Sequence, residues 1–160
     1  METNLSTADI FELARNNKSE ELKSAINGTN INGTDNRGST ALTIAAYYNN
    51  SEAVKVLLDA GADTGFQDGM GNTALMGICF KGYLQIGKIL LDHGAAVDAR
   101  NTNGSTALIF AATFGHTDMI KLLLQHGADR NHCDNFGKSA IDYARLKGNT
   151  ESIKLLEHEL

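Results

Sequence analysis

The sequence contains no proline and no tryptophan, and its 160 residues include only two cysteines, Cys79 and Cys133. These two thiols lie far apart in unlike sequence surroundings, which excludes the disulfide framework of a small secreted domain. No apolar run reaches the roughly 20 residues that a membrane-spanning helix needs, so we expect no membrane partner. Residues 1–5 are neither basic nor followed by an apolar segment, and we therefore expect no signal peptide. Without proline, the turns must be made by glycine, asparagine and aspartate.

An excess of positive charge is also lacking. The formal net charge is −5, with acids and bases mixed along the chain. A general nucleic-acid-binding protein needs a basic surface to neutralise phosphates, so we predict no nucleic-acid partner. Hydrophobic residues make up 42% of the chain, which is enough for a continuous core. We expect a cytoplasmic monomer; a secreted effector, or a periplasmic protein whose signal has been removed, stays open.

The 16 glycines are not scattered but recur with a spacing of 33 residues. Each recurring segment has aspartate or asparagine, then glycine, then a hydroxyl residue followed by alanine and leucine or isoleucine. The segments are residues 35–42, 68–75, 101–108 and 134–141. A second shared segment, Leu-Leu-x-x-Gly-Ala, occupies residues 57–62, 90–95 and 123–128. Such a period without insertions indicates a stacked repeat architecture.

Each unit predicts a turn followed by two helices. The turn glycine supplies a positive φ, and a hydroxyl residue then caps the first helix. These predicted caps are Thr40, Thr73, Thr106 and Ser139. The first helix, about two turns long, ends at a residue type that tolerates the left-handed conformation. These residues are Asn49, Gly82, Gly115 and Gly148. Neither helix can bury its apolar face alone, so the units must stack.

This pattern resembles the ankyrin repeat, most closely in residues 101–133, with Gly104, Thr106, Ala107, Leu108, Gly115 and His116. The usual proline and histidine at the start of the first helix are absent. Alanine replaces the proline at Ala41, Ala74, Ala107 and Ala140. Alanine is the best helix former, so we expect the fold to persist. Together with the asparagine-rich turns, this replacement looks more like bacterial members of the family.

The resemblance implies an all-α solenoid of stacked helix-turn-helix units with β-turn or hairpin tips. We expect one domain over residues 1–160. Its predicted parts are an N-terminal capping repeat at 1–34, regular repeats at 35–67, 68–100 and 101–133, and a C-terminal capping repeat at 134–160.

The resemblance also implies a non-catalytic adaptor, inhibitor or regulator that binds a protein on its concave face. That face would consist of the turn tips and the exposed sides of the first helices. Its predicted binding residues are Arg37, Tyr47, Tyr48, Met70, Phe80, Lys81, Arg100, Phe114, Phe136 and Lys138. Aromatic residues and arginine dominate interface energetics, and no acid is among them, so we expect a partner segment that is apolar with acidic character. Alternatively, the aromatic residues only pack between repeats and cover the core.

Two other functional classes remain to be weighed. A scaffold or engineered repeat protein would need no natural partner, but Gly77 and Gly87 inside helices cost stability that a designer would avoid. An enzyme would need a converging set of reactive side chains. His93 and His126 share one register about 10 Å apart, the packing distance of helices, which is too far for a shared metal. We therefore expect no catalytic residues, no metal and no cofactor.

Overall fold

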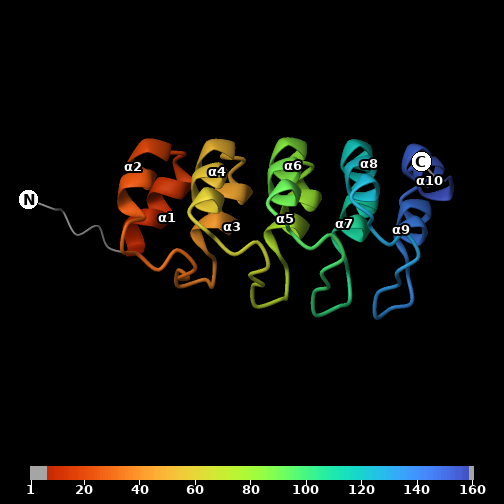
Figure 1. The fold of residues 1–160 in the computed structure, drawn as a ribbon. Coiled ribbons are helices and arrows are strands. Elements are labelled where there is room, and N and C mark those ends of the chain that lie inside the picture. The colour runs from red at the N-terminus through yellow and green to blue at the C-terminus, as the bar shows by residue number, and fades with distance from the viewer. Residues whose placement is uncertain (1–6, 159–160) are drawn as a thin grey trace, which may run out of the picture.

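The computed structural model describes residues 7–158, and within them the chain forms ten helices in five consecutive pairs. The pairs are α1 (Thr7–Arg15) with α2 (Ser19–Ala25), α3 (Ala41–Tyr47) with α4 (Ser51–Asp59), α5 (Ala74–Lys81) with α6 (Leu84–Asp92), α7 (Ala107–Thr113) with α8 (Thr117–Gln125), and α9 (Ala140–Leu146) with α10 (Thr150–Glu157). They stand side by side in chain order, and the long loops between pairs project to one side (Figure 1). The expectation for residues 1–5, and the outermost parts of both predicted capping repeats, lie outside the described residues.

The first helices begin and end where the sequence predicts. Thr40, Thr73 and Thr106 accept the backbone N–H three residues later with their hydroxyl oxygens. At the start of α9, Ser139 instead donates both its backbone N–H and its hydroxyl to the carboxylate of Asp142. The predicted terminating residues Asn49, Gly82, Gly115 and Gly148 have φ of 60°, 77°, 71° and 66°. Local turn and cap chemistry therefore sets the length of each helix.

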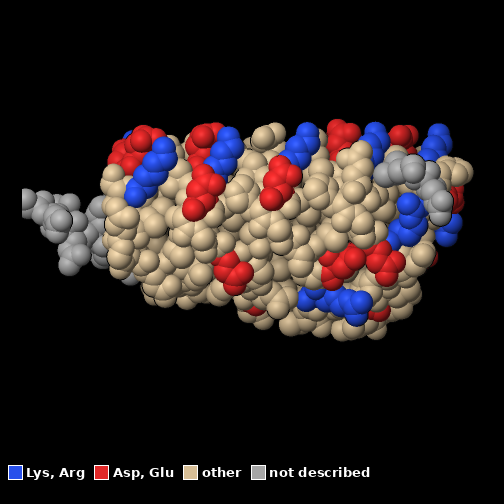
Figure 2. Space-filling model, viewed as in Figure 1, with Lys and Arg blue, Asp and Glu red and all other residues tan. Residues whose placement is uncertain are grey.

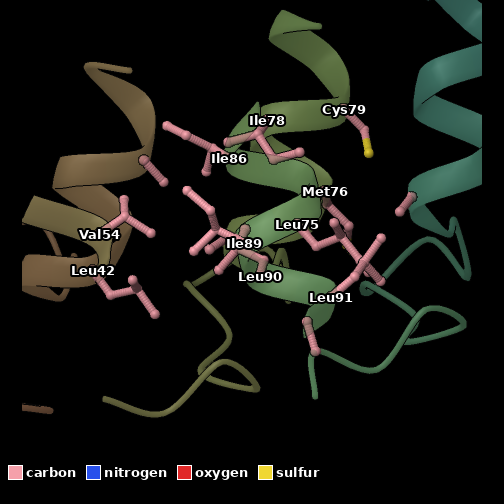
Figure 3. Close-up of a cluster of buried hydrophobic side chains, with 14 of the residues drawn as sticks. Leu42, Val54, Leu75, Met76, Ile78, Cys79, Ile86, Ile89, Leu90 and Leu91 are labelled. Carbon is pink, nitrogen blue, oxygen red and sulfur yellow. The ribbon is translucent and has the colours of Figure 1, made fainter. Parts of the chain in front are cut away.

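The core runs through the whole array. Each first helix contacts the first helices on either side of it, and the second helices do the same. Leu57, Leu90 and Leu123 occupy one register of the second helices and are fully buried. In Figure 3, Leu42 and Val54 lie on the side of the α5–α6 pair that faces the preceding repeat, and Cys79 points toward the following one. Burying each such leucine is worth about 1.5–3 kcal/mol, so stacking provides the stability that single pairs lack.

The second helices carry the charged outer surface. Lys55 pairs with Glu52 at 2.9 Å, and Lys121 with Asp118 at 3.8 Å. Figure 2 shows acidic and basic side chains next to each other along the edge formed by these helices. Exposed pairs of this kind contribute about 0–1 kcal/mol each, so they favour solubility more than stability. The all-helical solenoid is confirmed, whereas the exact repeat boundaries stay a prediction.

Candidate functional site

The turn tips share one hydrogen-bonded shape. In the first tip, the Oδ1 atom of Asp35 accepts the backbone N–H groups of Arg37 and Ser39 at 2.8 and 2.9 Å. The same two bonds recur in the later tips, from the side chains of Asp68, Asn101 and Asp134. Each tip is therefore a rigid support for the two or three exposed residues that it carries.

Hydrogen bonds join the later tips to one another but leave out the first. The backbone N–H of Thr102 donates to the carbonyl of Met70 at 3.0 Å, and that of Asn135 donates to Asn103 at 2.9 Å. Within residues 7–158, no hydrogen bond joins the tip at residues 35–39 to the tip at residues 68–72. The tips are thus linked in series from residue 68 onward, with an interruption between the first two.

One register of polar side chains fixes the ends of the first helices. The Asn50 side chain donates to the carbonyl oxygens of Ala14 and Arg15 at 2.9 and 2.7 Å. Two repeats later, Nε2 of His116 lies 3.0 Å from the carbonyl oxygen of Phe80. A Cβ at Gly82 would meet the His116 ring at 2.6 Å, so only glycine allows this approach. The His116 contact thus holds the end of α5, where the exposed Phe80 stands.

Four aromatic side chains at those helix ends are about half exposed. Tyr47 and Tyr48 are 57% and 51% exposed, and Phe80 and Phe114 are each 46% exposed. The two tyrosine rings meet edge to face with centroids 5.4 Å apart, and the two phenylalanine rings do so at 4.5 Å. We call these four residues the aromatic strip. Its rings cover one another in pairs, yet each leaves a large apolar area open to solvent.

Lysine and arginine side chains flank the aromatic strip. The Arg15 guanidinium, 5.9 Å from the centroid of the Tyr48 ring, is paired with Glu12 at 2.6 Å. The Nζ atom of Lys81 lies 4.5 Å from the centroid of the Tyr47 ring and 5.9 Å from that of Phe80. Arg37 stands exposed on the first tip. Across the described part of the chain, the cations of the tips and first-helix ends that have no carboxylate within 4.0 Å are Arg37, Lys81, Arg100, Lys138 and Lys147. These side chains can still pair with an incoming acid, unlike most of those on the outer surface.

A hollow of about 390 Å³ opens between α3 and α5, at the interruption between the first two tips. Its lining combines both tips with the facing sides of the two helices. The lining residues are Arg15, Asp35, Arg37, Ser39, Thr43, Ile44, Ala46, Tyr47, Tyr48, Asp68, Asn72, Thr73, Ala74, Gly77 and Ile78. We call this hollow the α3–α5 pocket. Gly77 is exposed within it, and a Cβ built at Gly77 would meet nothing within 4 Å.

A family model described as ankyrin repeats (three copies) matches residues 10–101 and 79–159. The chain belongs to the ankyrin-repeat family. The resemblance stated from the sequence is thus confirmed, and repeats of this family generally bind other proteins. No curated protein matches the chain. None of the helices between residues 7 and 158 is long and apolar enough to cross a membrane.

The predicted binding residues of this ankyrin-repeat chain fall into two groups. Six lie in or beside the α3–α5 pocket and the aromatic strip: Arg37, Tyr47, Tyr48, Phe80, Lys81 and Phe114. The other four are not among the lining residues of that pocket: Met70, which stands on the second tip, and Arg100, Phe136 and Lys138, which belong to later tips and loops. Phe136 and Lys138 line a separate hollow beside Leu146, at the C-terminal end of the array.

Sequence reasoning missed Gly77 and Arg15 as parts of the pocket. Gly77 stood out only as a helix-breaking residue, although the period of 33 aligns it with Ile44, Phe110 and Tyr143. Those three side chains are at least partly buried. Comparing side-chain volumes among the residues of one register, and not only their residue class, would have revealed the missing side chain at Gly77.

Two reactive side chains, Cys79 and Asp134, are engaged in the fold, whereas the Cys133 thiol is exposed. Burial raises the pKa of the Cys79 thiol, which keeps it protonated within the core. Burial also acts to raise the pKa of Asp134, but hydrogen bonds from the Tyr143 hydroxyl and two backbone N–H groups lower it on balance. Among residues 7–158, no group of three or more histidine, cysteine or acidic side chains could hold a metal ion.

Proposed function

We propose that this ankyrin-repeat chain is a non-catalytic adaptor, inhibitor or regulator that holds a protein partner against the aromatic strip and the turn tips. The observation that supports this proposal most is the half-exposed aromatic strip beside Arg37 and Lys81, which have no carboxylate within 4.0 Å among the described residues. Exposed aromatic residues with arginine and lysine around them are typical of binding surfaces.

The same observation describes the partner's chemistry. An aromatic side chain buries about 150–250 Å² in an interface, so covering the strip favours an apolar segment. Arg37 and Lys81 favour a segment that also carries aspartate or glutamate, because neither pairs with an acidic side chain within residues 7–158. We further propose that the protein acts as a cytoplasmic monomer.

The competing explanation is that the strip only covers the core, and stability measurements separate the two. Since Tyr48 and Phe114 are about half exposed, replacing either by alanine is expected to cost no more than about 1 kcal/mol, roughly the worth of one exposed aromatic pair. Leu123→Ala, at a fully buried position of α8, serves as the reference and is expected to cost about 2–5 kcal/mol. A loss for Phe114→Ala as large as that for Leu123→Ala would favour the covering role.

The direct test is capture of partners from a lysate of the source organism. The wild type is compared with a double variant, Tyr48→Glu with Phe114→Glu, after circular dichroism shows that both are folded. The matched control carries Gln85→Glu and Gln125→Glu, which add the same charge on exposed positions of α6 and α8. We expect a partner with the wild type and the control only. Equal capture by all three moves the site elsewhere, and no capture by any favours a scaffold without a partner.

A further inference from the structure

We propose that the α3–α5 pocket is an anchor site for one large apolar side chain of the protein partner. The partner carries an acidic residue beside this anchor, which pairs with Arg37 or Lys81. This inference rests on the proposed function and identifies the part of the surface that selects the partner. In this proposal Gly77 determines specificity, because the absence of a side chain at this position leaves room for the anchor.

The pocket exists because one helix position is empty. In the repeats before and after, the register of Gly77 holds Ile44, which is buried in the core, and Phe110, which is partly buried and packs against the core. Gly77 has no side chain, and nothing lies within 4 Å of the place where a Cβ would stand. Glycine inside a helix costs about 1 kcal/mol relative to alanine. Gly77 therefore lowers helix stability, and no close packing around it compensates for that loss.

The turn tips widen the same gap. Between the later tips, a backbone hydrogen bond such as that from Thr102 to Met70 draws neighbouring loops together. The corresponding residue of the second tip is Gly69, and within residues 7–158 it donates no hydrogen bond to the first tip. The pocket is thus open toward the tips as well as toward the surface of α5. A side chain entering from a partner segment finds an unobstructed path.

The walls suit an apolar occupant. Ile44 and Ile78 are almost completely buried beneath the pocket, and the rings of Tyr47 and Tyr48 form part of its rim. Its volume of about 390 Å³ is at the small end of the ~300–1,000 Å³ typical of ligand pockets. That space accommodates one phenylalanine, leucine or methionine side chain with a short stretch of backbone.

Two cations beside the pocket favour an acidic neighbour for that side chain. Asp35 and Asp68 line the pocket and remain negatively charged, but Oδ1 of each is directed into its own tip, where it accepts two backbone N–H groups. Arg15 is held by Glu12 at 2.6 Å. Arg37 and Lys81 have no carboxylate within 4.0 Å in the described part of the chain. An aspartate or glutamate next to the anchor would provide the missing partner for either cation.

The test uses defined peptides and backbone amide NMR of the full chain. The probe is acetyl-Gly-Asp-Phe-Glu-Asp-Gly-amide, with one control peptide carrying alanine for phenylalanine and another carrying lysine for every acid. We expect the probe to shift the amide signals of Gly77, Asn72 and Tyr48, and both control peptides to bind more weakly.

Filling the pocket from within provides the matched variant. Gly77→Phe places the side chain of the Phe110 register in the pocket, and Gly77→Leu is a smaller, strongly helix-forming alternative should the larger residue disturb folding. Either is expected to weaken probe binding by about 10- to 100-fold, the worth of burying one apolar side chain. Gln85→Phe, on an exposed position of α6, adds the same ring elsewhere and is expected to leave binding unchanged.

The outcomes separate the anchor from the proposed function. Shifts centred on Phe80 and Phe114 but absent at Gly77 would keep the aromatic strip as a binding surface and overturn the anchor pocket. Equal binding of the alanine control peptide, or undiminished binding to both folded Gly77 variants, would also overturn it. Absence of any shift overturns the anchor, whereas the proposed function stands or falls on the capture experiment.

Discussion

The two glycines inside helices provide the sharpest test of the packing described here. Gly77 and Gly87 lie in the adjacent helices α5 and α6, and each lowers helix stability by about 1 kcal/mol relative to alanine. At Gly77 an added Cβ meets nothing within 4 Å. Gly77→Ala is therefore expected to raise the free energy of unfolding by about 0.5–1 kcal/mol.

At Gly87 the same methyl group would meet a crowded interior. Its Cβ would lie 3.0 Å from both Sδ and Cε of Met119 and 3.3 Å from Cδ1 of Ile78. The flexible methionine can give way in part, but overpacking commonly costs about 1–3 kcal/mol. Gly87→Ala is therefore expected to be neutral or destabilising. Because both variants gain the same helix propensity, the overpacking cost should make Gly87→Ala at least about 1 kcal/mol less stable than Gly77→Ala.

Urea unfolding followed by circular dichroism measures both variants against the wild type. The comparison is internal, because both replacements add one methyl group to a helix of the same repeat. A Gly87→Ala variant as stable as Gly77→Ala would show that the space around Gly87 is not occupied as described. A destabilised Gly77→Ala variant would show that the α3–α5 pocket is not open at its floor.

Three further predictions concern local contacts. The Asp134 carboxylate accepts a hydrogen bond from the Tyr143 hydroxyl at 2.5 Å and raises the pKa of Tyr143 from 10.0 to about 12. This stabilisation is present below pH 10 and is lost as the pH rises to 12, so wild type and Tyr143→Phe should converge in unfolding free energy over that range. Thr40→Ala removes a helix cap and is expected to cost about 1 kcal/mol in urea unfolding, with Thr40→Ser as the conservative control. A thiol-specific disulfide reagent is expected to modify exposed Cys133 quickly and buried Cys79 only after unfolding, and Cys133→Ser should leave only the slow phase.

Most of the fold was predictable from the sequence because it depends on local chemistry. A hydroxyl residue such as Thr73 before an apolar run, and a glycine such as Gly82 after it, carry their own conformational preferences. Their recurrence every 33 residues then fixes the stacking order. The histidine usual at the first helix start is absent, and the first helices still begin as predicted, with Thr40, Thr73 and Thr106 accepting the first-turn N–H groups.

The candidate site was predictable only in part, since a hollow depends on what neighbouring repeats contribute. The register placed Tyr47 and Phe80 at helix ends, where both are about half exposed. It did not reveal that Phe80 meets Phe114 or that Lys81 lies over Tyr47, because side-chain directions across repeats are set by packing. The pocket itself required knowing that Gly77 leaves space and that the first two tips share no hydrogen bond.

Because the backbone of the array is regular, the absence of a side chain at Gly77 also bears on where along the array a partner binds. Each repeat presents nearly the same helix and the same tip, so the backbone alone offers a partner several equivalent positions along the array. Under the proposed anchor, the missing side chain at Gly77 removes that degeneracy and helps to determine the repeat at which the partner is held. Transferring the vacancy to the position of Phe110 would then displace the partner by one repeat along the solenoid, without any change in the contacts that the partner itself provides.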